Sequence, residues 1–225
     1  MTPFTALTAT AAPLLQDNVD TDTIIRVEPL FGGIPRDQLG PYALAALRFQ
    51  PDGSEHPDFV LNRKPYRNAG ILVAGNNFGC GSSREGAVWA LMARGVRCVI
   101  APSFGDIFYG NCFQNGMLPI KLERAQVEAL ANVVADEQKA TLTIDLVAGT
   151  IRTVDDVLIR FELPARRREG LLQGLDDLEL TLARSAEIDQ FQRRDASLRP
   201  WIYLTGEQRP VDPAEPQDLE HKETT

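Results

Sequence analysis

Residues 75–86 hold the side chains of this sequence that are best suited to chemistry. Their sequence is GNNFGCGSSREG, so two hydroxyls and a guanidinium, on Ser82, Ser83 and Arg84, follow a glycine-rich turn. An apolar run at 71–74 enters the turn, and a helix is expected to leave it. The first N–H groups of a helix lack partners within it, and the helix dipole is positive there, so anions are favoured. The segment predicts a site for a small carboxylated or phosphorylated ligand.

The common nucleotide-binding loops do not match this segment. A dinucleotide fingerprint, G-x-G-x-x-G, would need glycine where Arg84 stands. A P-loop has the spacing found between Gly81 and Gly86 but would need lysine in place of Ala87. A nucleotide-dependent enzyme is therefore disfavoured.

Ser82 has two explanations. The run SSRE matches a capping box, in which Ser82 and Glu85 would bond each other's backbone N–H groups at the helix start. Alternatively, the positive end of the helix and the cation of Arg84 would both favour the alkoxide form of the Ser82 hydroxyl. The alkoxide could then act as a base or nucleophile. The residues alone leave both explanations open.

An acidic turn at 17–25, with the sequence DNVDTDTII, is the second segment of interest. Its Asn and Asp residues match the first, third and fifth positions of a calcium loop. However, Thr23 stands in place of the required glycine and Pro29 in place of the required glutamate. Side chains that hydrogen-bond their own turn explain the segment without calcium.

The composition narrows the classes of protein. The chain has 225 residues, 44% of them hydrophobic and 24% charged, which predicts a globular protein with one main domain. A net charge of −8 disfavours a nucleic-acid partner. Three cysteines without a CxxC spacing, and only two histidines, predict no metal site. The odd cysteine count without a signal peptide favours the cytoplasm, and no apolar run reaches the ~20 residues that span a membrane.

The periodicity predicts alternating strands and helices around these segments. Residues 1–16 are expected to form an edge strand, and the Gly- and Pro-rich connection at 28–58 is expected to be functional or mobile. Further strands are expected at 71–75, 96–101, 117–122, 141–147, 150–154 and 158–161, and helices at 83–94, 106–114, 125–138, 165–173 and 181–194. This order predicts an α/β sandwich forming a single domain over 1–205, with a disordered polar tail at 206–225.

Three segments, in this order, resemble the small subunits of 3-isopropylmalate dehydratase, the stand-alone counterpart of the aconitase swivel domain. They are the acidic turn at 17–25, residues 77–85, and the strand-to-turn segment 99–108, VIAPSFGDIF. The likeness covers roughly residues 12–196. It implies an α/β, three-layer β/β/α swivelling domain. It also implies a separate large subunit that carries a [4Fe–4S] cluster, over which this chain would close as part of a heterodimer or heterotetramer.

The resemblance also implies roles for individual residues. Ser82 would be the general base that takes a proton from the carbon beside the departing hydroxyl. Arg84 would clamp a substrate carboxylate, which suits its bidentate geometry, and Ser83 would hydrogen-bond the same group. Asp22 would orient neighbouring groups.

Two features depart from the family's usual pattern. Gly86 stands where many relatives have histidine, which would loosen that helical turn. Arg26 stands where most have proline, and an unfamiliar segment, 27–33, follows it. In the family this loop reads the substituent of the substrate, so Arg26 would favour an additional carboxylate or a polar group.

The resemblance therefore predicts a hydro-lyase that is active only with its large subunit. It would isomerise 2-isopropylmalate to 3-isopropylmalate, by dehydration and rehydration, in leucine biosynthesis. The substrate would be a small di- or tricarboxylate hydroxy acid. The alternatives are the small subunit of a citraconate, dimethylmaleate or homoaconitate hydratase, and a non-catalytic anion-binding or assembly module.

Overall fold

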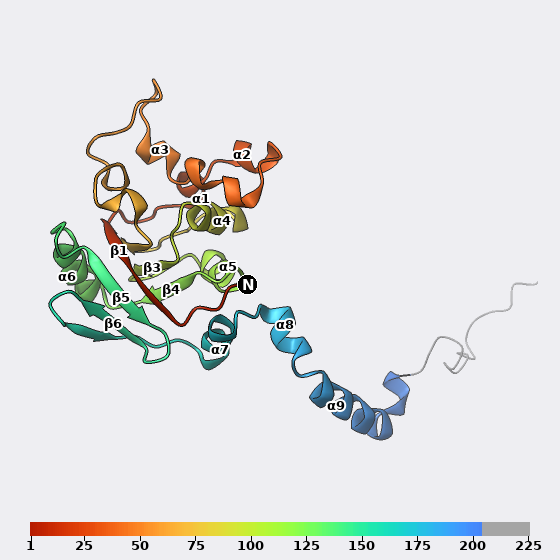
Figure 1. Ribbon diagram of the computed structural model, residues 1–225. Helices are drawn as coiled ribbons and strands as arrows, with labels where there is room; N and C mark the ends of the chain where they lie inside the picture. Colours follow the sequence, from red (N-terminus) through yellow and green to blue (C-terminus); the bar gives the residue numbers. More distant parts are fainter. Residues whose placement is uncertain (204–225) are drawn as a thin grey trace, which may run out of the picture. The chain divides into compact units, whose positions relative to one another are not determined.

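The computed structural model describes residues 1–203 (Figure 1). They form two compact units, one of Met1–Leu180 and a second that begins at Thr181. The α/β class is confirmed. The single-domain boundary at 205 stays a prediction, and the expected disordered tail at 206–225 lies outside the described residues.

The strands of the first unit form one seven-stranded sheet in the order β4-β3-β2-β1-β5-β6-β7. Strands β1 to β4 pair in parallel, and β1, β5, β6 and β7 pair antiparallel. Their bounds are β1 Ala6–Leu14, β2 Ile71–Ala74, β3 Cys98–Ala101, β4 Leu118–Lys121, β5 Thr141–Asp145, β6 Thr150–Thr153 and β7 Leu158–Arg160.

The prediction that the first strand lies at an edge is wrong, because β1 is the central strand. Its first part pairs with β5, with Ala6 opposite Asp145, and its last part pairs with β2, with Leu14 opposite Ala74. Ala11 and Ala12 are fully buried, one on each face of the sheet. Burial on both faces at these two positions removes the polar side of the alternation in the last part of β1, whereas Ala6–Thr10 stay exposed or partly exposed.

Three of the five expected helices are confirmed, two differ at their ends, and the short helices at Thr21–Ile24, Val27–Phe31 and Ala45–Arg48 were not expected. Those expected at 106–114, 125–138 and 165–173 are confirmed to within a few residues, whereas α4 begins two residues later than expected and the last expected helix is divided into α8 and α9. The bounds are α1 Thr21–Ile24, α2 Val27–Phe31, α3 Ala45–Arg48, α4 Glu85–Ala93, α5 Asp106–Asn115, α6 Arg124–Val134, α7 Ala165–Gln173, α8 Asp177–Leu182 and α9 Ser185–Leu198. The connection at 28–58 contains α2, α3 and short 3-10 turns at Arg36–Gln38 and Gly40–Tyr42.

Buried side chains cover both faces of the parallel strands. On β2, Leu72 belongs to the cluster beneath α4 and α5, while Ile71 and Val73 belong to the cluster beneath α6 and α7. The aromatic side chains of Phe104, Phe108 and Phe113 are buried in these clusters. This two-sided packing fixes the ends of β1, β2 and β3, from which the site is built. No helix within residues 1–203 is long and apolar enough to cross a membrane.

Candidate functional site

The three segments singled out in the sequence follow three neighbouring parallel strands. The acidic turn follows β1, the glycine loop follows β2, and the segment that begins at Pro102 follows β3. Parallel strands end at the same edge of a sheet, so the three loops meet there. The crevice outside the carboxyl ends of such strands is where α/β proteins usually bind ligands.

Backbone hydrogen bonds join the acidic turn to the glycine loop. They run from Asn18 N to Asn76 O (2.8 Å), from Gly79 N to Val19 O (2.7 Å) and from Thr21 N to Cys80 O (2.9 Å). A carboxylate of the turn adds a fourth bond, since Asp17 Oδ1 accepts from Asn76 N at 2.7 Å. This backbone bond is also the first cause that holds the pKa of Asp17 below its usual value. The two loops are thus one hydrogen-bonded unit.

The third segment, which begins at Pro102, is also hydrogen-bonded to the glycine loop. Phe78 N donates to Ser103 O at 3.1 Å, and Gly105 N donates to Phe78 O at 3.0 Å. Gly79 has a φ of +72°, and a Cβ there would lie 2.2 Å from Cγ of Phe108. The loop therefore requires glycine at this position for its backbone conformation and for the aromatic ring packed against it.

An ion pair links the acidic turn to the start of α4. Arg84 Nη1 donates to Asp22 Oδ1, and the same nitrogen lies 3.4 Å from the carbonyl oxygen of Ile25. The side chain of Arg84 is 21% exposed and that of Asp22 55%. The pair is thus half-buried at the rim of the site, and the structure brings together two of the predicted site residues.

Asp20 holds the short helix that carries Asp22. Its Oδ1 accepts from Thr23 N at 2.7 Å, which makes it the N-cap of α1. The hydrogen bonds from Thr23, first its side chain and then its backbone, lower the pKa of Asp20. The interpretation that the acidic turn bonds its own backbone is confirmed.

Of the two explanations for Ser82, the structure contradicts the capping box. Helix α4 begins at Glu85 with Arg84 as its N-cap, and no side chain caps it. The carbonyl of Ser82 accepts from Thr21 Oγ1 at 3.0 Å and from Arg84 N at 2.8 Å, which holds Ser82 outside the helix. Glu85 instead accepts from Asn115 Nδ2 at 2.8 Å. Ser82 and its neighbour Ser83 are both exposed, so neither is committed to the helix end.

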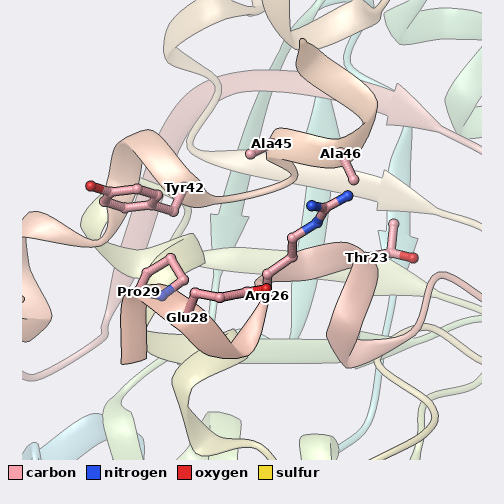
Figure 2. Close-up of a pocket in the computed structure, with 7 residues that line it drawn as sticks. All are labelled: Thr23, Arg26, Glu28, Pro29, Tyr42, Ala45 and Ala46. Atoms are coloured by element: carbon pink, nitrogen blue, oxygen red, sulfur yellow. The ribbon is translucent and has the colours of Figure 1, made fainter. Parts of the chain in front are cut away.

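Arg26 lines a pocket of about 250 Å³ (Figure 2). Its guanidinium points between Thr23 and Ala46, and Thr23 directly follows Asp22 in α1. The residues that line the pocket are Thr23, Arg26, Glu28, Pro29, Tyr42, Ala45 and Ala46. Tyr42, Ala45 and Ala46 come from the later part of the long connection, and the sequence alone did not single them out. The one available signal was the length of that connection, which is typical of functional loops.

Residues 1–203 offer no set of side chains that fits a metal cluster. No group of three or more His, Cys, Asp or Glu side chains in residues 1–203 lies close enough together to hold a metal ion. Cys98 and Cys112 are buried, and burial raises the pKa of both thiols. Cys80 is half-buried in the glycine loop. No step is therefore assigned to a metal held by this chain.

Comparisons with known proteins agree with this geometry. The family model of the aconitase C-terminal domain matches residues 1–125. The 3-isopropylmalate dehydratase small subunit of Rhodospirillum centenum is 52% identical over 89% of this chain and 98% of its own length. That of Brucella anthropi is 51% identical over 89% of this chain and all of its own length. A crystal structure of 3-isopropylmalate dehydratase from Methanocaldococcus jannaschii superposes with a TM-score of 0.58, at 28% identity, over 82% of this chain and 98% of that one.

The fold, the three joined loops and these matches define the class: the chain belongs to the aconitase C-terminal domain family. Within that family it is similar to the small subunits of 3-isopropylmalate dehydratase, over nearly their whole length. The resemblance predicted from residues 17–25, 77–85 and 99–108 is confirmed.

Proposed function

We propose that this chain acts as the small subunit of a 3-isopropylmalate dehydratase, an aconitase-type hydro-lyase of leucine biosynthesis that interconverts 2- and 3-isopropylmalate. The observation that carries the proposal is the Arg84–Asp22 pair beside exposed Ser82, in a chain 52% identical to a protein of that name. The partner is a large subunit, in a heterodimer or heterotetramer. The cytoplasm, where the three free cysteines would stay reduced, is the proposed location.

Arg84 is proposed to bind a carboxylate of the substrate. Within residues 1–203 its side chain makes its hydrogen bonds through Nη1. The guanidinium carries five N–H donors in a fixed plane, so Nε and Nη2 can serve a substrate while Asp22 holds the other side. Ser83, exposed and adjacent, is placed to add a hydrogen bond to the same carboxylate.

Ser82 is proposed as the general base. It would take the proton from the carbon beside the hydroxyl-bearing carbon, the C–O bond would break with loss of hydroxide, and water would add back at the neighbouring carbon. The hydrogen bond from Thr21 Oγ1 to the carbonyl oxygen of Ser82 holds this residue in place. Its hydroxyl does not cap the helix. A closed site strengthens the attraction between an alkoxide and nearby cations. Closure against the large subunit is proposed to supply that environment. The same subunit is proposed to hold the [4Fe–4S] cluster, which supplies a Lewis acid when bound.

The pocket that contains Arg26 is proposed to receive the substituent that distinguishes related substrates. Its walls include the apolar groups of Pro29, Ala45 and Ala46, which suit a branched alkyl group. The guanidinium of Arg26 favours a second candidate, a hydratase whose substrate carries an additional carboxylate, such as homoaconitate.

The test is reconstitution of the cluster-loaded large subunit with this chain, with the large subunit alone as control. Hydration of isopropylmaleate, citraconate, dimethylmaleate and homoaconitate is measured. We expect the highest kcat/KM with isopropylmaleate. A preference for homoaconitate would favour the second candidate. If the complex forms but hydrates none of the four compounds, the chain is a non-catalytic anion-binding or assembly module instead.

A further inference from the structure

Gly86, in the first turn of α4, lies directly under the side chain of Leu30 in α2. Gly86 is buried, and a Cβ there would lie 2.6 Å from Cδ2 and 2.7 Å from Cδ1 of Leu30. Such distances are shorter than any real contact, so the side chain of Leu30 occupies the space that a side chain at position 86 would need. Because Gly86 has no side chain, Leu30 can pack directly against its Cα; this contact is called the Leu30 seat below.

Leu30 is the apolar side chain of α2 that holds this helix on the body of the protein. It packs against the buried cluster beneath α4, whereas Val27 is 38% exposed and Phe31 86% exposed. Helix α2 has five residues, and no side chain caps its start. A helix this short has little stability of its own, so its position depends on its packing contacts.

The same helix forms one wall of the pocket that contains Arg26. Arg26 is the N-cap of α2, and Glu28 and Pro29 belong to its first turn. The seat, in turn, is in α4, whose N-cap is Arg84. The contact between Leu30 and Gly86 thus joins the helix that carries the pocket wall to the helix that begins at the carboxylate-binding arginine.

We propose that Leu30 and Gly86 are positioning residues that set the distance between the pocket wall and Arg84, and so determine which substrate substituent is accepted. The inference rests on the proposed function. It assigns no new role to Ser82 or Arg84 themselves and concerns only the distance of the pocket wall from them. Moving α2 would change the space for the substituent and leave the proton transfer intact.

The first test measures the contact itself, by thermal unfolding of the complex with its large subunit. G86A should lower Tm when Leu30 is present, because the new methyl group meets the leucine. In the L30A background the same substitution should raise Tm, because alanine is a better helix former than glycine once the space is free. G110A is the matched control: Gly110 lies in α5 with nothing within 4 Å of its Cβ position, so G110A should raise Tm in both backgrounds.

The second test measures discrimination between isopropylmaleate and citraconate, which differ in an isopropyl against a methyl group. L30A should reduce the ratio of their kcat/KM values about tenfold, the effect of a methylene-scale misfit in an apolar pocket. The kcat at saturating citraconate should stay close to that of wild type. L30M, which keeps the volume, should restore most of the ratio, and G110A should leave it unchanged.

The outcomes separate this inference from the function on which it rests. If wild type hydrates neither substrate, the proposed function fails, while the Tm cycle still tests the contact. If wild type is active and L30A keeps the wild-type ratio in an assembled complex, Leu30 does not set specificity. If G86A shifts Tm equally with and without Leu30, the seat does not exist.

Discussion

The parallel and antiparallel halves of the sheet contribute differently to this protein. Every predicted site residue lies after β1 or β2 of the parallel half, and the loop after β3 packs against them. The antiparallel half, β5 to β7, supplies none of the predicted site residues. The reason is geometrical, because parallel strands all end at one edge, whereas consecutive antiparallel strands end at opposite edges.

The two halves are also held together differently. At the parallel edge, backbone groups of one loop bond backbone groups of the next, as between Thr21 and Cys80. In the antiparallel half, a cross-strand pair such as Thr8 and Thr143, with oxygens 2.9 Å apart, adds to an ordinary ladder. Changes at the parallel edge should therefore alter activity, and changes in the antiparallel half should alter stability alone.

The largest effect is expected from S82A. Removing a general base costs about 10²–10⁴-fold in rate, so kcat of the reconstituted complex should fall by that amount. Assembly with the large subunit should be unchanged, because Ser82 is exposed and its backbone carbonyl remains bonded to Thr21. A kcat within twofold of wild type would remove Ser82 from the mechanism.

The next largest effect is expected from G79A, measured as the free energy of unfolding. Alanine would be strained at a φ of +72°, and its methyl group would meet the ring of Phe108. Overpacking of this kind costs about 1–3 kcal/mol, in addition to the strain. G33A is the matched control, since Gly33 has the same φ of +72° with nothing within 4 Å. Equal losses for the two variants would show that the contact with Phe108 costs nothing.

R84K is expected to weaken substrate binding. Lysine keeps the charge but cannot bond Asp22 and a carboxylate in one plane. A lost charge-assisted hydrogen bond is worth about 1.5–3 kcal/mol, so KM should rise by roughly tenfold or more. D22N, which keeps the shape of the partner, should have a smaller effect on KM. If R84K raised KM less than D22N does, the carboxylate would bind elsewhere.

A smaller effect, with a defined pH dependence, is expected from D20A. Loss of the α1 cap should destabilise the protein by about 1 kcal/mol at neutral pH. Since the folded pKa of Asp20 is lowered, its contribution is complete above the ordinary aspartate pKa and is lost as pH falls through the folded value. The difference in stability between wild type and D20A should therefore narrow in acid. A difference that is constant with pH would mean that the carboxylate charge contributes nothing.

The smallest effect is expected from T143A in the antiparallel half. The cross-strand pair with Thr8 is exposed, so its loss should cost about 0.2–1 kcal/mol of stability. Reconstituted activity should equal that of wild type. A change in kcat/KM would contradict the division between the two halves.

Much of the site was predictable because it depends on local sequence. The glycine loop after an apolar run, and the acidic turn with its short-range hydrogen bonds, are encoded within about ten residues each. The helices α5, α6 and α7 were likewise predictable from periodicity and from the residues at their ends.

What could not be predicted depends on contacts between distant residues. The SSRE run satisfies a local capping rule, but its groups bond to distant residues instead. Thr21, 61 residues earlier, donates a hydrogen bond to the carbonyl of Ser82, and Asn115 donates one to the carboxylate of Glu85. The central place of β1 depends on its pairing with β2 and β5, far along the chain. Local propensity carries no information about such partners.

The sequence by itself determined the class of chemistry, because hydroxyls, a guanidinium and glycines in residues 75–86 restrict what the loop can bind. It also determined the family, through three short segments. Only the tertiary structure decided that Arg84 pairs with Asp22, that Ser82 stands outside the helix, and that Leu30 sits on Gly86 beside the pocket of Arg26. These facts depend on the spatial order of the strands, which places segments remote in the sequence within hydrogen-bonding distance.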